Sequence, residues 1–245
     1  MALFYLFLIT SILLALYTYK GVKQYNHKKH MNELPTSKIR SIAMGLVELH
    51  GKARGYKELL KSPMSMKDCI YYRYKVEKLV STGRHTYWVT LKEGHSGRYF
   101  FLEDETGNVL VDLDGADIDI NKDTRKSSGM FKDPPEKIKS FLKKEGLSYE
   151  GLFGINKTMR YTEWFIAPED ELYIVGTAGD NPFVREASSD LNENDIMIQK
   201  AGSEFYVTED KMSLLPAQSF VRDLFYIFVF LILLFFWVIS LASIM

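Results

Sequence analysis

Two long apolar runs flank a charged interior along the chain. Residues 2–19 and 224–245 contain no Lys, Arg, Asp, Glu or His. At about 1.5 Å per helical residue, these runs extend about 27 and 33 Å, which matches a hydrocarbon core of about 30 Å. Because backbone amides in lipid must be satisfied within their own segment, each run predicts a membrane-spanning helix.

Between the two runs, the pattern changes to short segments typical of β-strands. The clearest is Ile70–Glu77, where a period of two predicts two distinct faces. One face carries Ile70, Tyr72, Tyr74 and Val76, and the other carries Tyr71, Arg73, Lys75 and Glu77. Further strands are expected at 42–52, 86–91, 98–102 and 109–112, with turns at 93–97 and 105–108.

The second half of the interior predicts one helix and then more strands. Asp133–Gly146 offers Asp133 as N-cap and Gly146 as C-cap, with an apolar stripe of Ile138, Phe141 and Leu142. Residues 159–167 and 172–177 predict a hairpin with its turn at 168–171, and short strands follow at 196–199 and 205–207. The expected fold class is α+β and mostly β: a compact antiparallel sheet or small barrel with one inserted helix, flanked by two transmembrane helices.

Charge is unevenly distributed along the chain. The 245 residues include 31 basic and 31 acidic side chains, yet 20–40 carries a net +5 and 41–221 a net −5. We therefore divide the chain into spans at 2–19 and 220–245, a basic juxtamembrane linker at 20–38 and a domain at 39–215. Basic side chains near a bilayer favour anionic head groups by about 1 kcal/mol each. The candidate membrane-surface residues are Lys20, Lys23, Lys28 and Lys29.

The predicted topology is a two-pass integral membrane protein with both termini on the same side. The first run is interpreted as an uncleaved anchor, because it lacks a preceding basic segment and a small-x-small cleavage pattern. By the positive-inside rule, the basic linker places the domain in the cytoplasm, and setting this orientation is a simpler role for the four lysines than lipid recognition.

The interior contains no recognisable catalytic or cofactor motif. Cys69 is the only cysteine, which leaves no partner for a disulfide or a zinc finger. A Cys69 nucleophile with a base from His50, His85 or His95 lacks a local signature. The series Asp112, Asp114, Asp117, Asp119 and Asp123 fails the EF-hand spacing. We expect no catalytic residue, metal or cofactor.

Two further ligand hypotheses are weak. The segment Tyr71–Lys75 mixes aromatic and basic side chains, as strands that stack nucleobases do. The net acidic charge of the domain disfavours phosphates, so we expect no nucleic-acid partner, and no small-molecule substrate is evident. Asn156-Lys-Thr is a glycosylation triplet that would matter only on the extracytoplasmic side.

Three segments resemble one known family. They are Gly45–Ala53 continuing through Leu60–Glu77, then Phe101–Asp112, and then Arg160–Ala178. In this order, and with the flanking apolar runs, they are similar to the GIDE/MULAN family of membrane-anchored E3 ubiquitin ligases. In that family a "beside a membrane" domain lies between two helices and a RING finger follows. The resemblance implies a partner-recognition domain. Mitochondrial members hold it in the intermembrane space, which opposes the cytoplasmic placement above.

The function expected from these observations is binding rather than catalysis. A RING finger needs a set of Cys and His ligands, so the lone Cys69 predicts a form without one. We expect a two-span membrane protein whose central domain is a non-catalytic module for a protein or lipid partner. One alternative is a membrane subunit of a ubiquitin-ligase-like or other enzyme complex whose catalytic part is a separate chain. Another is an enzyme with Cys69 as nucleophile.

Overall fold

Five strands close into a small barrel in the computed structural model, which describes residues 34–151, 154–184, 195–202 and 204–211, with Tyr19, Ile227, Phe228 and Leu231. The predicted spans therefore lie almost entirely outside the described residues. Within those residues, no helix is long and apolar enough to cross a membrane. The domain that follows is one compact unit, Pro35–Asp210.

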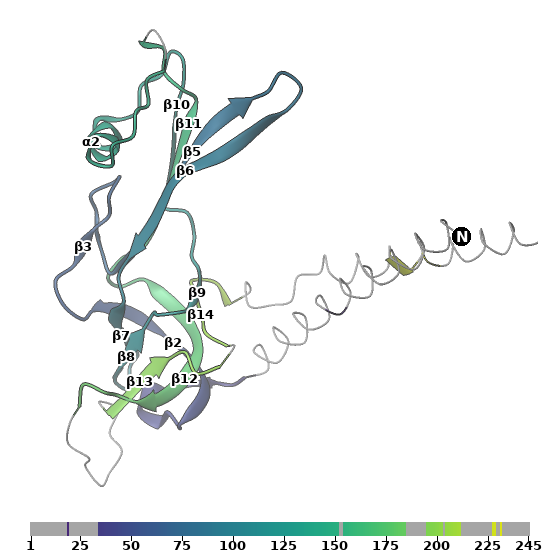
Figure 1. The fold of residues 1–245 in the computed structure, drawn as a ribbon. Coiled ribbons are helices and arrows are strands. Elements are labelled where there is room, and N and C mark those ends of the chain that lie inside the picture. The colour runs from purple at the N-terminus through teal and green to yellow at the C-terminus, as the bar shows by residue number, and fades with distance from the viewer. Residues whose placement is uncertain are drawn as a thin grey trace, which may run out of the picture. The chain divides into compact units, whose positions relative to one another are not determined.

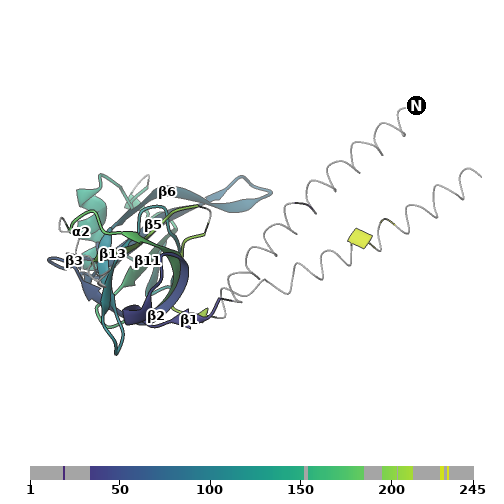
Figure 2. The same cartoon turned by 90° about the horizontal axis from the view of Figure 1, so that it is seen from below.

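The barrel closes because β2, its first strand along the chain, pairs with a neighbour on each of its two edges. β2 lies between β7 and β12, and the ring is completed through β8 and β13. The β8–β13 pair is parallel and the other pairs are antiparallel. Figure 2 shows β2 curving around the barrel. The strands are β2 (Gly45–Gly55), β7 (Tyr99–Glu103), β8 (Asn108–Asp112), β12 (Glu171–Asp180) and β13 (Ile196–Gln199).

The strand order of this barrel is that of an OB-fold. Numbered along the chain, the barrel strands run first, second, third, fifth, fourth and back to first, with the third and fifth parallel. This is the five-stranded Greek-key arrangement of OB domains. The expectation of a mostly β domain that forms a small barrel is thus confirmed.

The barrel encloses the larger of two apolar cores. Alternate residues of its strands point inward, so Leu49, Phe100, Leu102 and Ile174 are fully buried. Gly51 is required where β2 passes close to the backbone of β7, because a Cβ at this position would lie 2.5 Å from the Glu103 carbonyl oxygen. Short strands extend the barrel sheet: β1 (Thr36–Ser37), β9 (Asp117–Asp119) and β14 (Tyr206–Thr208).

A second, four-stranded antiparallel sheet rises above the barrel (Figure 1). Its β5 and β6 are inserted between the first and second barrel strands, whereas β10 and β11 lie between the third and fourth. The strand order is β10 (Thr124–Ser128), β11 (Met159–Ile166), β5 (Tyr71–Ser81) and β6 (Thr86–Ser96). The short pair β3 (Leu60–Lys61) and β4 (Asp68–Cys69) precedes β5.

Helix α2 (Glu136–Lys144) covers one face of this sheet. Ile138, Phe141 and Leu142 are buried as predicted, and they join Tyr74 and Tyr161 in the smaller core. The C-terminal end is also confirmed. Gly146 has a φ of +68°, and the Leu147 N–H donates to the Leu142 carbonyl at 2.8 Å.

The predicted N-cap of this helix is wrong. The helix begins after Pro135, and Asp133 instead accepts a hydrogen bond from the Asn156 side chain at 2.6 Å and pairs with Lys139. Pro135 supplies fixed φ at the helix start without a side-chain cap.

The predicted hairpin over 159–177 is also wrong. β11 belongs to the four-stranded sheet, whereas β12 belongs to the barrel. The connecting turn binds β2 instead: the Ala53 N–H donates to the Asp170 carbonyl, and the Glu169 N–H donates to the Ala53 carbonyl, both at 2.9 Å. A short polar turn between two alternating strands usually indicates a hairpin. Here the turn forms hydrogen bonds with a third strand, β2, and the two flanking strands do not pair with each other.

The predicted turn at 93–97 is shifted. β6 continues through Ser96, and the chain turns at Gly97, whose φ is +111°. A Cβ at Gly97 would lie 2.5 Å from the Ile70 carbonyl oxygen, so only glycine fits at this passage from sheet to barrel. The hairpin predicted at 105–108 is confirmed between β7 and β8.

One residue of the clearest predicted strand is more buried than its neighbours on the same side. Tyr71, predicted to share a face with Arg73, is 5% exposed and lies in the barrel core beside Ile70. β5 starts at the barrel and continues into the upper sheet, so a single period of two cannot describe its burial. A β-bulge between Val76 and Glu77 further shifts its pairing with β6.

Candidate functional site

The face of the four-stranded sheet opposite α2 gathers aromatic and basic side chains, and we call it the open face. Residues paired across antiparallel strands point to the same side, which places Arg73 beside Trp164 and Arg160 beside Glu77. The pairing with β10 and β6 extends the same side to both edges. The open face consists of Arg73, Lys75, Glu77, Trp88, Thr90, Glu93, His95, Arg125, Arg160, Thr162 and Trp164.

Two arginine guanidinium groups lie over two tryptophan rings on this face. The Arg73 guanidinium carbon lies 4.6 Å from the Trp164 ring centroid, and that of Arg160 lies 4.4 Å from the Trp88 centroid. Stacking of this kind holds a guanidinium in place while its edge N–H groups remain available to an acceptor. The two pairs therefore present fixed cationic groups rather than freely mobile ones.

A nearly buried carboxylate lies between the basic groups. The Arg160 Nε donates to Glu77 Oε2 at 2.6 Å, and Lys75 Nζ lies 3.9 Å from the other oxygen. The hydrogen bond from Arg160 is the largest cause of the lowered pKa of Glu77, and burial opposes it. Four arginine and lysine side chains against two glutamates leave the open face with a net charge of +2.

A cleft of about 730 Å³ lies at the barrel end of the open face. Arg73, Lys75, Glu93, His95 and Trp164 line it from β5, β6 and β11. Trp164, one of these lining residues, also packs against the barrel core. The cleft thus offers an aromatic wall with basic and imidazole side chains around it, which suits an anionic group on a larger partner.

β6 forms a free edge beside this face. Among the described strands, β6 pairs only with β5. Its first half, Thr86–Leu91, has no charged side chain, and Tyr87, Trp88 and Leu91 are 49%, 38% and 39% exposed. A long edge strand with exposed apolar side chains is a template for pairing with another strand.

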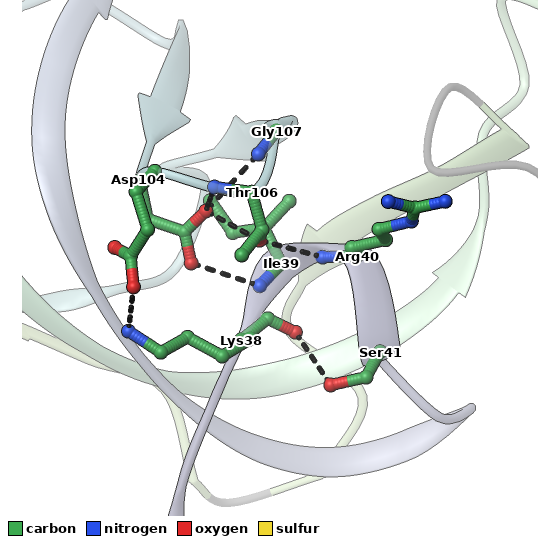
Figure 3. Close-up of polar contacts among 8 residues, drawn as sticks. Lys38, Ile39, Arg40, Ser41, Asp104, Thr106 and Gly107 are labelled. Carbon is green, nitrogen blue, oxygen red and sulfur yellow. Dashed lines mark hydrogen bonds and ion pairs between the residues drawn. The ribbon is translucent and has the colours of Figure 1, made fainter.

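The segment that leads into the barrel is fixed by a single carboxylate (Figure 3). Asp104, in the β7–β8 turn, accepts hydrogen bonds from the N–H groups of Ile39, Thr106 and Gly107 at 3.0, 2.7 and 3.1 Å, and one from the Thr106 hydroxyl. Lys38 pairs with Glu105, and the Arg40 N–H donates to Thr106 Oγ1 at 3.1 Å. We call this cluster the linker junction.

The ionisation of Asp104 follows from this geometry. Burial opposes its negative charge, but the hydrogen bonds from Thr106, Ile39 and Gly107 outweigh burial and lower its pKa. Residues Lys38 to Arg40, at the end of the predicted linker, are therefore bound to the β7–β8 turn of the barrel. The predicted membrane-surface residues Lys20, Lys23, Lys28 and Lys29 lie outside the described residues.

The residues considered for catalysis are not brought together. Cys69 is fully buried, its thiol lies 3.6 Å from the Leu60 carbonyl, and burial raises its pKa to about 11. Within the described part of the chain, no hydrogen bond links it to a histidine. His50 stacks on Tyr173, His95 lies against Tyr71, and His85 occupies the β5–β6 turn. Burial is typical of an inert thiol.

The acidic series has structural roles. Asp112 accepts two hydrogen bonds from Arg98, both at 2.9 Å, and Asp123 accepts one from the Phe165 N–H at 2.8 Å. Asp117 and Asp119 lie in β9. The described residues contain no group of three or more His, Cys, Asp or Glu side chains suited to a metal ion.

Comparison with protein families identifies this architecture. Residues 70–212 match the family model GIDE, described as E3 ubiquitin ligase. The chain belongs to the GIDE family. The match covers more than half of the chain and includes the whole four-stranded sheet with its open face. No curated protein and no solved structure matches the chain.

The GIDE match starts at β5 and therefore omits β2, the strand that closes the barrel. It ends after β14, within the domain predicted at 39–215. The resemblance found in the sequence is thus confirmed.

Sequence reasoning identified the β5 part of the open face, which is three of its eleven residues. The alternation in Ile70–Glu77 placed Arg73, Lys75 and Glu77 on one side, as the structure has them. Arg160, Thr162 and Trp164 were missed, although the same alternation over β11 was available as a signal. Their proximity to β5 depends on a pairing across more than 80 residues, which no local pattern reveals.

Proposed function

We propose that this GIDE-family chain is a two-span membrane protein whose central domain is a non-catalytic module that binds an acidic segment of another protein. Residues 2–19 and 220–245 would be its spans, and the open face its binding surface. The single observation that carries the proposal is the pair of arginines held over tryptophan rings on a sheet face whose Thr90, His95 and Arg125 are exposed.

Charge favours an acidic partner. The domain sequence is net acidic over 41–221, yet the open face is net basic. An acidic segment would be attracted to this face and repelled by much of the surrounding surface, which gives orientation as well as attraction. Because Arg73 and Arg160 are already positioned by their rings, binding orders few additional side chains.

The free edge favours a protein over a lipid. An extended segment can add to β6 as a further strand and satisfy the outward backbone groups of that edge. Its alternate side chains would then point over the open face, toward Arg160 and the cleft at Arg73. A lipid head group could use the charges but not the edge.

The family match favours a second candidate function. Since the GIDE model is described as an E3 ubiquitin ligase, the chain could serve as the membrane subunit of a ligase-like complex whose catalytic part is a separate chain. The open face would then recruit a ligase component or a substrate. Purification of the complex from native membranes, followed by a ubiquitin-transfer assay, distinguishes this from simple binding.

Two neighbouring residues of β10 provide a matched test. Arg125 pairs with Thr162 on the open face, whereas Lys126 pairs with Tyr161 on the helix side, and both are exposed. The full chain in neutral-lipid nanodiscs would be titrated with an oligo-glutamate peptide while tryptophan fluorescence is recorded. Trp88 and Trp164 lie within the site.

We expect Arg125→Glu to weaken binding by about tenfold and Lys126→Glu by less than about twofold at low salt. Equal effects of the two substitutions, or no binding by the unmodified chain, would contradict an acidic-segment site on the open face. A fluorescence change with anionic vesicles but none with the peptide would favour a lipid instead.

A further inference from the structure

The barrel carries a second candidate site, separate from the open face. In OB-folds, ligands bind on the face of the second and third strands, between the loop that follows the first strand and the loop that joins the fourth and fifth. Here those strands are β7 and β8, and those loops begin after Gly55 and Asp180. The strand order therefore indicates where a ligand groove would lie before any side chain is considered.

A groove of about 300 Å³ lies at this place. Tyr56 contributes from the first loop, Phe101 from β7, Asn108 from β8, and Phe183 from the later loop. Tyr56, the β7–β8 hairpin and Phe183 are far apart in the sequence and come together through the folding of the barrel. The volume is at the lower end of the range for small-ligand sites, about 300–1,000 Å³.

Aromatic rings form the walls of the groove. The Tyr56 ring centroid lies 5.5 Å from that of Phe101 and 6.5 Å from that of Phe183. Tyr99 meets Phe183 edge-on at 5.4 Å. Phe183 is nevertheless 53% exposed, so the cluster leaves a ring surface open to solvent instead of burying it.

Residues 181–184, which carry Phe183, are joined by local hydrogen bonds. The Phe183 N–H donates to Asn181 Oδ1 at 3.1 Å, and the Val184 N–H donates to the Asn181 carbonyl at 3.2 Å. The Asn181 N–H in turn donates to the Asp195 carbonyl at 2.8 Å. These hydrogen bonds hold an apolar ring at the surface, where burial alone would not place it.

The described lining of the groove disfavours phosphate-rich ligands. Among the residues that the structure describes, the lining contains no Lys, Arg, His, Asp or Glu side chain. Two basic side chains beside the described aromatic cluster are engaged elsewhere: Arg98 lies over Tyr99 and donates two hydrogen bonds to Asp112, and Lys57 lies over the Tyr56 ring. Nucleic-acid binding draws most of its affinity from basic side chains that contact phosphates, and the described lining residues supply none.

We propose that this groove binds a neutral oligosaccharide. The C–H faces of a sugar ring carry partial positive charge and pack on the negative face of an aromatic ring, whereas its hydroxyl groups hydrogen-bond to carboxamides. Phe183 and Tyr56 supply the rings, and the exposed Asn108 supplies a carboxamide. OB barrels use this face for oligosaccharides as well as oligonucleotides, and the neutral lining selects the former.

The test uses the full chain in nanodiscs free of glycolipid. Neutral hexasaccharides of glucose, mannose and N-acetylglucosamine would be screened separately by saturation-transfer NMR, beside an uncharged hexapeptide and a six-nucleotide oligo-dT. We expect saturation of the C–H protons of at least one sugar and none of oligo-dT. Saturation of the peptide or the oligo-dT alone, or of no probe, would overturn the proposal.

Substitutions at one exposed ring locate the binding. Phe183→Ala should weaken sugar affinity by about tenfold, and Phe183→Trp should retain it because a ring face remains. Phe131, which is 97% exposed in a distant turn, provides the matched control, and Phe131→Ala should leave affinity unchanged. Equal affinity in the Phe183→Ala and unmodified chains would overturn the assignment.

A third substitution separates this site from the open face. Arg73→Glu should abolish acidic-peptide binding and leave sugar binding unchanged, because Arg73 lies on β5 and not on the barrel groove. Loss of sugar binding in Arg73→Glu would contradict two independent sites.

Discussion

The barrel is a closed sheet around an apolar core, whereas the four-stranded sheet is open and carries charged groups on one face. Barrel closure leaves no free edge on β2, and among the described residues its core contains 20 buried apolar side chains. The upper sheet has two edges, only eight buried apolar residues, and one face occupied by charged groups and tryptophan. The contrast teaches that the closed barrel contains the larger apolar core, whereas the sheet leaves one face and two edges without a comparable core.

The largest expected effect tests whether the two cores are independent. Phe100→Ala in the barrel core should lower the free energy of unfolding by about 3–5 kcal/mol, because the ring is fully buried and leaves a cavity. Phe141→Ala in the α2 core makes the same chemical change. Native-state hydrogen exchange would measure both.

We expect Phe100→Ala to reduce protection in both regions, and Phe141→Ala to reduce it mainly in α2 and the upper sheet. Uniform loss of protection in both variants would show that the two cores unfold as one, and would remove the basis for treating them as separate units.

A smaller effect is expected from the ion pair of the sheet. Arg160→Met leaves the nearly buried Glu77 carboxylate without its donor, which should destabilise the fold by about 1–3 kcal/mol and raise the pKa of Glu77. The double substitution Glu77→Leu with Arg160→Met should recover much of that loss. Urea unfolding measures the free energy of unfolding of the single and the double variant. A double variant less stable than Arg160→Met would contradict the expected recovery.

The linker junction predicts a pH dependence. Because Asp104 has a lowered pKa in the fold, its stabilising contribution is complete above the ordinary Asp pKa of about 4 and is lost as pH falls through the lower folded value. Asp104→Asn should remove this acid dependence and cost about 1 kcal/mol at neutral pH.

Asp123 provides the opposite case for comparison. Burial raises its pKa, so its ionised form is disfavoured in the fold, and stability should rise as pH falls through that raised value. The Asp123→Asn chain should therefore lose stability more steeply than the unmodified chain as pH falls, because this opposing contribution is gone. Unfolding curves at several pH values check both signs, and identical pH profiles in the two variants would be inconsistent with them.

The smallest effect concerns the thiol. With Cys69 fully buried and its pKa raised to about 11, iodoacetamide should label the folded chain no faster than the domain opens. Mass spectrometry after labelling, with and without urea, measures this. Rapid labelling of the native chain would restore the nucleophile hypothesis.

The sequence predicted local features well and long-range ones poorly. The α2 apolar stripe, Gly146 and the β7–β8 hairpin follow from contacts within a few residues, and all three are confirmed. The separation of β11 from β12, the burial of Tyr71 and the Arg160–Glu77 pair depend on which distant strands meet. The alternation of apolar and polar residues along a strand predicts which side chains share a face, but it does not predict which other strand pairs with it.

The same limit applies to the two candidate sites. Arg73 and Lys75 were visible as an alternating basic pair, whereas the tryptophans beneath the arginines were not assigned to that face. The barrel groove left no signal in sequence, because Tyr56, Asn108 and Phe183 come from three separate segments. Only the barrel topology brings them together.

The central claim, that the open face recognises a protein segment, is tested most directly by photo-crosslinking in native membranes. A benzophenone amino acid would replace Thr90 on β6, and in a parallel chain Ser140 on α2, both of which are exposed. We predict a recurrent protein adduct from position 90 that disappears with Arg125→Glu and persists with Lys126→Glu. Equal adducts from both positions, or an adduct insensitive to Arg125→Glu, would contradict the account.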